Sequence, residues 1–433
     1  MAVKLPDYSP LAKGKDELLD VVRGLCMAAV IMVHVGYGKV NPRGTGLSMY
    51  VDSVWFDFAS WAVVWGLAFF PISGALSRKL SGVRLRTYWR QRAPRLLLPY
   101  YAFALVMVAV ELAIRAFGPP DNVCANFNLK KVVTWIFPLH TDCLGLAQGP
   151  LWFLMTFLPI VLMAPVFLKV YDSRWRFRAI WIGFAALVLF DVGLLTNTTT
   201  MHLDNMLGQS SPDGLLLLVV TVHMLVFWSI QFYLGFLYAD GYTTKLEEKG
   251  RLLPLAVALM GVCTVLVVSG LYAHNPWGWW KGTCADVSCD GNQFPATLAY
   301  MAGSVGGYLF LVWGRRGLLW FGRLPVVKPS LRWLSVRSLT IMIWHMVSYE
   351  IVYWSLRGLG WIDEIESWPQ WIQRPFFIAL VVAVTLLLVW IFYPLEKVTW
   401  FQPKAKASPE ASQGAERTTP PPGAEPEPEP APS

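Results

Sequence analysis

The sequence predicts an all-α, polytopic integral membrane protein with about ten transmembrane helices and both termini in the cytoplasm. Its 433 residues are 55% apolar and only 15% charged, whereas soluble domains carry about 25% charged residues. Apolar runs of about 20 residues, the length that crosses a bilayer core, recur along the chain. The net charge of +8 comes from basic residues in alternate short loops, a membrane-topology pattern that argues against nucleic-acid binding.

These apolar runs predict ten spans. The spans together form one membrane domain, which lies between two tails. Residues 1–17 form a cytoplasmic amino tail, 18–400 the membrane domain and 401–433 a carboxyl tail. The carboxyl tail is rich in Pro, Ala and Glu and has almost nothing to bury, so we expect it to be disordered and cytoplasmic. The spans lie near residues 18–37, 54–76, 96–117, 150–168, 179–195, 215–239, 252–273, 294–314, 338–356 and 375–394.

The distribution of Lys and Arg predicts the orientation of the spans. Most of the 36 basic residues lie in the two tails and in the loops after the second, fourth, sixth and eighth spans. The most basic of these loops are 78–95 and 314–337. Because cytoplasmic loops carry the excess of Lys and Arg, these loops and both termini are predicted to be cytoplasmic.

Four cysteines lie in predicted outer loops, as two local pairs. Cys124 and Cys143 share one loop, and Cys284 and Cys289 share another. Paired cysteines on the outer side are disulfide candidates in an oxidising compartment. The alternative, a zinc site, lacks the tight C-x₂-C pairs usual for such sites, so we predict no metal.

The first span, residues 18–37, carries three ionisable residues, Asp20, Arg23 and His34. In a helix, the eleven-residue step from Arg23 to His34 leaves the two side chains about 20° apart on one face and about 16 Å apart along the axis. Ionisable groups within a membrane are costly and usually face a protein interior or a wet cavity. The alternative is that Arg23 snorkels to the interface and His34 lies near water at the far end.

The second span runs inward and ends in AFFPISGALSRKL, residues 68–80. Pro and Gly loosen this helix and free backbone groups that need partners or a lined cavity. Ser73 lies in the inner half of the span, where we interpret it as a helix-packing or ligand-positioning residue.

An arginine-rich segment follows on the cytoplasmic side. Arg92 and Arg95 form an RxxR pair, and we expect Pro94 and Pro99 to break the helix before the third span resumes at Tyr100. Guanidinium groups bind phosphate through bidentate, charge-assisted hydrogen bonds, so this pair is a candidate nucleotide-binding element. The alternative is that the arginines only obey the positive-inside bias or contact anionic lipid.

The later spans contain isolated polar or aromatic residues with two interpretations each. Trp152, at the outer start of the fourth span, either flanks the entrance for a ligand or anchors the interface. Asp191 in the fifth span either pairs with an arginine or faces the cavity. His223 and Gln231 in the sixth are predicted to hydrogen-bond between helices. His345 in the ninth either shapes the cavity or is a core histidine bonded to backbone.

Five motifs occur in order: Arg-x₁₀-His in the first span, FFPISG at 69–74, RQRAPR at 90–95, GPLWFL at 149–154 and SLTIMIWH at 338–345. This arrangement resembles the membrane acyltransferase-3 family over about residues 15–400. The resemblance implies acyl-CoA-dependent O-acyl transfer, commonly of acetyl, from the cytoplasm to a hydroxyl of an extracytoplasmic or membrane-embedded glycan or glycolipid. It also implies a bacterial plasma membrane (inner membrane) location, with acyl-CoA as donor substrate and no permanently bound cofactor.

The residues fit such a reaction. Arg23, Arg92 and Arg95 lie on the predicted donor side and would hold the CoA phosphates. His34 lies near the acceptor side, where a neutral imidazole would act as general base on a hydroxyl. We expect direct transfer, although a covalent acyl-enzyme remains an alternative. Ser73, Trp152 and His345 are assigned to the cavity or to acceptor positioning.

A second class of function is a proton-coupled membrane transporter that uses Arg23, His34 and His345 as a relay. Carriers more often show paired repeats with broken helices in matching positions, which the sequence lacks. Acyl-CoA-dependent modification of an acceptor would distinguish the enzyme from the transporter. The sequence leaves the acceptor, the acyl chain length and the oligomeric state open.

Overall fold

A computed structural model of the chain describes residues 16–36, 68–78, 81, 84–117, 151–195, 214–272 and 296–397. Within these ranges the regular structure is helical and no β-strand forms, which confirms the all-α class. The carboxyl tail and the four loop cysteines lie outside the described residues, so the disulfide candidates stay predictions.

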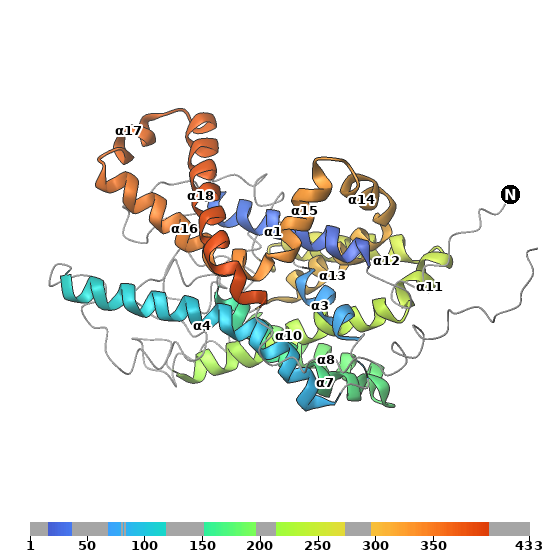
Figure 1. The fold of residues 1–433 in the computed structure, drawn as a ribbon. Coiled ribbons are helices and arrows are strands. Elements are labelled where there is room, and N and C mark those ends of the chain that lie inside the picture. Colours follow the sequence, from blue (N-terminus) through green and yellow to red (C-terminus); the bar gives the residue numbers. More distant parts are fainter. Residues whose placement is uncertain are drawn as a thin grey trace, which may run out of the picture.

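Figure 1 shows how the helices are arranged, with α4, α7, α8 and α10 below and α14 to α18 above. The helices of the first half are α1 (Glu17–Gly36), α3 (Phe69–Arg78), α4 (Leu85–Phe117), α7 (Leu151–Asp172), α8 (Arg176–Leu195) and α10 (Gly214–Ala239). Those of the second half are α11 (Tyr242–Glu248), α12 (Leu252–Val268), α13 (Leu298–Trp313), α14 (Arg315–Gly322), α15 (Val327–Val336), α16 (Ser338–Gly358), α17 (Ile362–Ser367), α18 (Gln370–Phe392) and the 3₁₀ helix η1 (Tyr393–Lys397).

The helix positions agree closely with the predicted spans. Eight helices (α1, α7, α8, α10, α12, α13, α16 and α18) begin and end within about five residues of a predicted span, as expected where apolar periodicity is strong. By length and composition, four helical stretches could cross a membrane, or five if the pair α11 and α12, bent by 103°, forms one span. The four are Leu85–Phe117, Phe153–Asp172, Thr221–Ala239 and Trp371–Lys397. The total of ten spans stays a prediction.

The predicted helix break before Tyr100 is wrong. α4 is one helix of 33 residues that contains both Pro94 and Pro99. Each proline removes the hydrogen bond to a carbonyl four residues earlier, at Arg90 or Arg95. Both of these arginines are exposed, so water or lipid headgroups can satisfy the freed carbonyls and the helix continues.

The short helix α3 packs against α10 through two facing glycines. A Cβ atom on Gly74 would overlap the carbonyl oxygen of Phe232, and one on Gly235 would overlap that of Pro71. Small residues allow two helix backbones to approach this closely. The glycine of the FFPISG motif is therefore a packing residue.

Polar residues inside the bundle connect helices. The Gln231 amide donates to the Ser304 hydroxyl over 2.7 Å, and the His223 Nε2 lies 2.8 Å from the Ala296 carbonyl oxygen. The Gln231 contact confirms the predicted helix–helix hydrogen bond, whereas His223 bonds to a residue two positions before α13 begins. Asp191 is different, because it accepts from the Tyr272 hydroxyl and from the backbone N–H at the start of α13, over 2.8 Å. It joins α8 to α13 and does not line the cavity described below.

The ends of α1, α3, α7 and α10 meet in one polar cluster. Arg78 at the end of α3 forms ion pairs with Asp172 over 2.7 Å and with Asp240 over 2.9 Å. The Tyr238 hydroxyl donates to Asp16, just before α1, over 2.9 Å. Burial disfavours the charge of Arg78, but the two carboxylates outweigh it and hold its pKa above the ordinary value. These four ends are the ones that the sequence predicts to share the cytoplasmic side.

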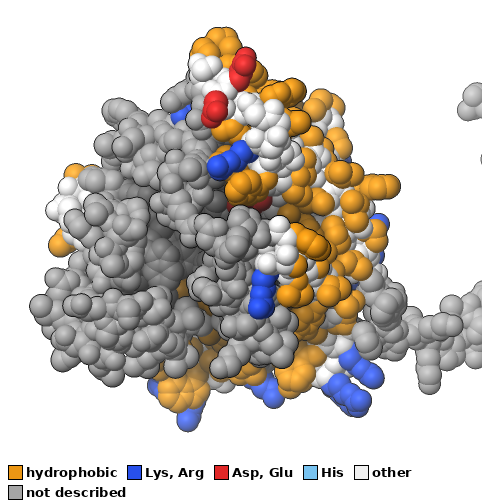
Figure 2. All heavy atoms as spheres, turned by 90° about the vertical axis from the view of Figure 1, so that its left-hand side faces the viewer, with side chains coloured by type: hydrophobic (Ala, Val, Ile, Leu, Met, Phe, Trp, Pro, Cys, Tyr) orange, Lys and Arg blue, Asp and Glu red, His pale blue; other side chains and the backbone are white. Residues whose placement is uncertain are grey.

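The outer surface of the helices is strongly apolar. Leu105, Leu189 and Trp390 are each more than 70% exposed. Figure 2 shows hydrophobic side chains over most of the described part of one face, with basic side chains along its lower edge. Large exposed apolar surfaces are rare on soluble monomers and are normal where helices contact lipid. This surface agrees with a membrane protein.

Candidate functional site

A cavity of about 160 Å³ lies between α1, α3, α4, α7 and α16. It combines two arginines and three serines with an apolar, partly aromatic wall. The lining residues are Arg23, Phe69, Ser73, Leu76, Ser77, Arg92, Leu96, Phe153, Phe157, Val161, Ser338, Leu339 and Met342. Five helices far apart in sequence therefore build one site.

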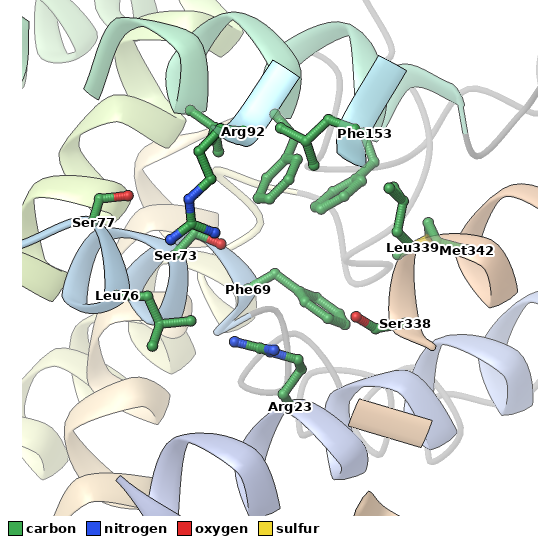
Figure 3. Close-up of a pocket in the computed structure, with 13 residues that line it drawn as sticks. Arg23, Phe69, Ser73, Leu76, Ser77, Arg92, Phe153, Ser338, Leu339 and Met342 are labelled. Carbon is green, nitrogen blue, oxygen red and sulfur yellow. The ribbon is translucent and has the colours of Figure 1, made fainter. Parts of the chain in front are cut away.

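The two arginines reach into the cavity from opposite sides. Figure 3 shows Arg23 extending from α1 and Arg92 from α4, so that their guanidinium groups point toward one another. Both side chains are half-buried, and neither has a hydrogen-bond or ion-pair partner among the described residues. Two like charges held together without a bound counterion are unfavourable. The cavity is therefore complementary to an anion.

The carboxylates that attract Arg23 over a longer distance are Asp20 and Glu396. Both are engaged elsewhere. Asp20 accepts from the Ser335 hydroxyl over 3.4 Å, and Glu396 accepts from the backbone N–H of Thr340 over 2.7 Å. Thr340 lies in the first turn of α16, whose N–H groups have no partner within the helix. Glu396 thus caps α16 beside the cavity and leaves Arg23 facing the open space.

Three hydroxyl groups complete the polar part of the lining. Ser73 and Ser77 lie one turn apart on α3, and Ser338 begins α16. In Figure 3, Ser73 lies close to the guanidinium of Arg92, and Ser338 lies on the side of Arg23. Hydroxyls donate to and accept from a bound polar group. They suit a ligand whose oxygens need several donors.

The opposite wall is aromatic and tightly packed. Phe69 meets Phe153 edge-to-face at 5.8 Å between ring centroids, and Phe153 stacks on Phe157 at 4.8 Å. Phe70, which is fully buried behind them, stacks on Trp228 at 4.4 Å. Interlocked rings of this kind lose little conformational freedom on binding a ligand. The apolar end of the cavity therefore has a fixed size.

The start of α1 is anchored outside the cavity. Glu17 forms an ion pair over 2.7 Å with Arg323, in the turn between α14 and α15. The hydrogen bond from Arg323 lowers the pKa of Glu17. Because folding lowers this pKa, the pair stabilises the fold at neutral pH and its contribution is lost as the pH falls below the carboxyl range. Both side chains are exposed, so this contribution is small.

The structure brings together three of the residues predicted from the sequence and leaves others apart. Arg23, Ser73 and Arg92 line one cavity. Arg95 is exposed, one turn further along α4, and does not line it. His34 lies in the last turn of α1, on the predicted helix, but its side chain is outside the described residues. The Trp152 side chain, in the first turn of α7, is also outside them.

His345 belongs to the core and does not line the cavity. It is fully buried, and its Nδ1 lies 3.0 Å from the carbonyl oxygens of both Ile341 and Met342. Carbonyl oxygens only accept, so Nδ1 carries the proton and Nε2 the lone pair. Of the two interpretations of His345, this geometry agrees with a core histidine that is bonded to the backbone.

Two polar lining residues were not singled out from the sequence, Ser77 and Ser338. Ser77 lies four residues after Ser73, which places it on the same helix face. This spacing could have identified Ser77 from the sequence. Ser338 gives no such signal, because its position depends on how α16 packs. In the described residues no group of three His, Cys, Asp or Glu side chains could hold a metal ion.

A family model described as an acyltransferase domain, Acyl_transf_3, matches residues 16–393. The match begins just before α1 and ends at the first residue of η1, so it includes every helix that lines the cavity. Neither a curated protein nor a solved structure matches the chain.

Proposed function

This chain belongs to the acyltransferase-3 family, and we propose that it is an acyl-CoA-dependent membrane O-acyltransferase. The donor is acetyl-CoA or a similarly short acyl-CoA, taken from the cytoplasm. The acceptor is a hydroxyl of a glycan or glycolipid on the outer side of the plasma membrane or within it. The observation that carries this proposal is that Arg23 and Arg92 line one cavity and have no hydrogen-bond or ion-pair partner among the described residues.

The arginines bind the diphosphate of CoA. Guanidinium groups hold phosphate oxygens by paired, charge-assisted hydrogen bonds, and the bound anion removes the repulsion between the two like charges. Arg95, exposed one turn beyond Arg92, extends the positive charge toward the surface and attracts the nucleotide. The cavity of about 160 Å³ is below the range of about 300–1,000 Å³ for drug-sized ligands. It therefore holds only part of CoA, and the adenosine end stays outside.

The size of the acyl group follows from the aromatic wall. Phe69, Phe153 and Phe157 close the apolar end with packed rings. Enlarging such a space requires displacing a packed side chain, which costs free energy. A short acyl group such as acetyl fits this enclosure better than a long chain.

His34 activates the acceptor. It lies eleven residues beyond Arg23 on α1, about 16 Å further along the axis. The pantetheine arm of CoA extends from the arginines along the aromatic wall and places the thioester, with its acyl group, between that wall and His34. The imidazole takes the proton of the acceptor hydroxyl as its oxygen attacks the thioester carbonyl. The C–S bond then breaks, the ester forms, and the proton passes to the CoA thiolate. This step is a direct transfer without an acyl-enzyme.

The test is acetyl-CoA binding by the purified protein, with Arg92→Ala beside Arg90→Ala. Arg90 lies on the same helix, is exposed and does not line the cavity, so it is a matched control. A hydrogen bond to a charged group contributes about 1.5–3 kcal/mol, so Arg92→Ala should weaken binding at least tenfold while Arg90→Ala changes it less than twofold.

Equal losses in the two variants would contradict the cavity as the donor site. No saturable acyl-CoA binding by the folded wild type would favour the proton-coupled transporter that uses Arg23, His34 and His345.

A further inference from the structure

A second cavity, a groove of about 550 Å³, lies between α7, α8 and α10 and shares no residue with the first. These three helices lie side by side at the lower edge of Figure 1. The groove is lined almost entirely by apolar side chains, among them Phe167, Val170, Ile180, Val222 and Val226. It runs along α10 from Val222 to Tyr233, a distance of about 16 Å. That length is close to one leaflet of a hydrocarbon core about 30 Å thick.

One end of this groove is basic. Trp175, in the turn between α7 and α8, lines that end, and the Arg178 guanidinium lies 5.5 Å from the centre of its ring. Lys169 and Arg174 flank the same turn. All three cations are exposed, and none has an ion-pair partner among the described residues.

Arg176, the fourth cation near this turn, differs from the other three because its side chain is hydrogen-bonded within the fold. Arg176 donates to the Tyr171 carbonyl oxygen over 2.8 Å and to the Tyr242 hydroxyl over 3.1 Å. It holds the turn in place, whereas Arg174 and Arg178 make no side-chain hydrogen bond within the described ranges of the chain.

Tyr233 contributes a buried polar group to the floor of the groove. Tyr233 lines the groove and is only 5% exposed, and its hydroxyl has no hydrogen-bond partner within the part of the chain that the structure describes. A buried hydroxyl without a partner costs free energy. An ester or phosphate oxygen that enters from the basic end would supply the missing acceptor.

We propose that this groove binds one anionic phospholipid. An acyl chain lies along α8 and α10, and the phosphate faces Arg174 and Arg178. A free phosphate would leave the apolar length unused, and a neutral lipid would leave the cations unused, so only an anionic amphiphile matches both features. The basic turn belongs to the predicted cytoplasmic side, and the cytoplasmic leaflet is the anionic one.

The experiment is native mass spectrometry of the full chain in detergent, titrated with phosphatidylglycerol or phosphatidylcholine that carry the same acyl chains. The wild type should bind the first lipid at least tenfold more tightly. Each basic residue near an anionic lipid contributes about a fivefold effect. The double variant Arg174→Gln/Arg178→Gln should therefore lose the preference, while Arg251→Gln/Arg316→Gln, exposed cations elsewhere, should keep it.

A second pair of variants tests the acyl-chain part of the groove. Val222, in the groove, is 51% exposed and Val262, on α12, is 49% exposed, so the two positions are matched in exposure. Val222→Trp should weaken the binding of both lipids at least fivefold, and Val262→Trp should not. Equal binding of the two lipids by the wild type, or equal effects within either pair of variants, would overturn the proposal.

Discussion

At the scale of single residues, the arginines fall into two groups that differ in how their charge is neutralised. Arg78 is held by two carboxylates and a nearby tyrosine ring, so it stabilises the junction of helices. Arg23 and Arg92 line a cavity and have no such partner among the described residues. An arginine that the fold does not neutralise is available to a ligand, which is why we assign the donor site to these two.

The two histidines of the motifs should respond differently to substitution. We predict that His34→Ala abolishes acyl transfer while acetyl-CoA binding and the melting temperature stay near wild type, because His34 acts only on the acceptor hydroxyl. His345→Ala should instead lower the melting temperature, because it leaves a space in a fully buried position. Turnover, acetyl-CoA binding and thermal unfolding, measured on both variants, check this difference. Near-normal transfer by folded His34→Ala would remove its assignment as general base.

The aromatic wall should determine the acyl chain length. Phe153→Ala removes a ring that packs against both Phe69 and Phe157 and enlarges the apolar end of the cavity. We expect kcat/KM for butyryl-CoA or hexanoyl-CoA to rise at least tenfold relative to acetyl-CoA. Phe184→Ala, a 37% exposed phenylalanine on α8 away from the cavity, is the control and should keep the wild-type preference. An unchanged preference in Phe153→Ala would place the acyl group elsewhere.

At the scale of secondary structure, α3 is short but central. It contributes Phe69, Ser73 and Ser77 to the cavity, and its opposite side packs against α10 through Gly74. Because the two backbones are in contact, a small shift of α3 moves cavity residues as well. The FFPISG motif therefore combines a site with the packing that positions it.

Substitution of either facing glycine should separate these helices. Gly74→Ala and Gly235→Ala each place a methyl group against a backbone carbonyl that cannot move aside. Overpacking of this kind costs about 1–3 kcal/mol, so we predict a clear fall in melting temperature and weaker acetyl-CoA binding. Gly261→Ala, in the middle of α12 with open space around its Cβ position, is the matched control. It should be neutral or slightly stabilising, because Ala is the better helix former.

At the scale of the whole molecule, one end of the bundle is defined by contacts between helix ends. Besides the Arg78 cluster, Arg315 at the start of α14 pairs with Glu247 of α11 over 3.1 Å. These ends are far apart in sequence, and each is predicted to be cytoplasmic from the charge of its loop. Their proximity agrees with a common side for all of them.

The predicted sidedness can be tested by labelling. A cysteine introduced as Lys249→Cys, exposed between α11 and α12, should react with a membrane-impermeant maleimide in inside-out vesicles and not in intact cells. The wild type is the background control, because its buried Cys26 and Cys263 and the predicted Cys124–Cys143 and Cys284–Cys289 disulfides should not react. Labelling in intact cells would reverse the orientation, and free thiols at the four loop cysteines would remove the disulfide prediction.

The sequence by itself determined the class of protein, most helix positions and the family. Apolar length and periodicity are local properties, so eight predicted spans coincide with helices to within about five residues. The need of Gln231 and His223 for a hydrogen-bond partner was predictable for the same reason, because each is a polar side chain within an apolar helix. The ordered motifs led to the family because each is a short local pattern.

Only the tertiary structure decided which side chains share the site. Arg92 and Arg95 lie three residues apart, and the rotation of α4 against its neighbours places the first in the cavity and leaves the second exposed. Ser338 lines the site as the first residue of α16, a helix whose first turn is capped by Glu396, far away in sequence. The helix through Pro94 and Pro99 continues because Arg90 and Arg95, four residues before each proline, are exposed. Each of these outcomes depends on packing between helices, which the pattern along one helix does not contain.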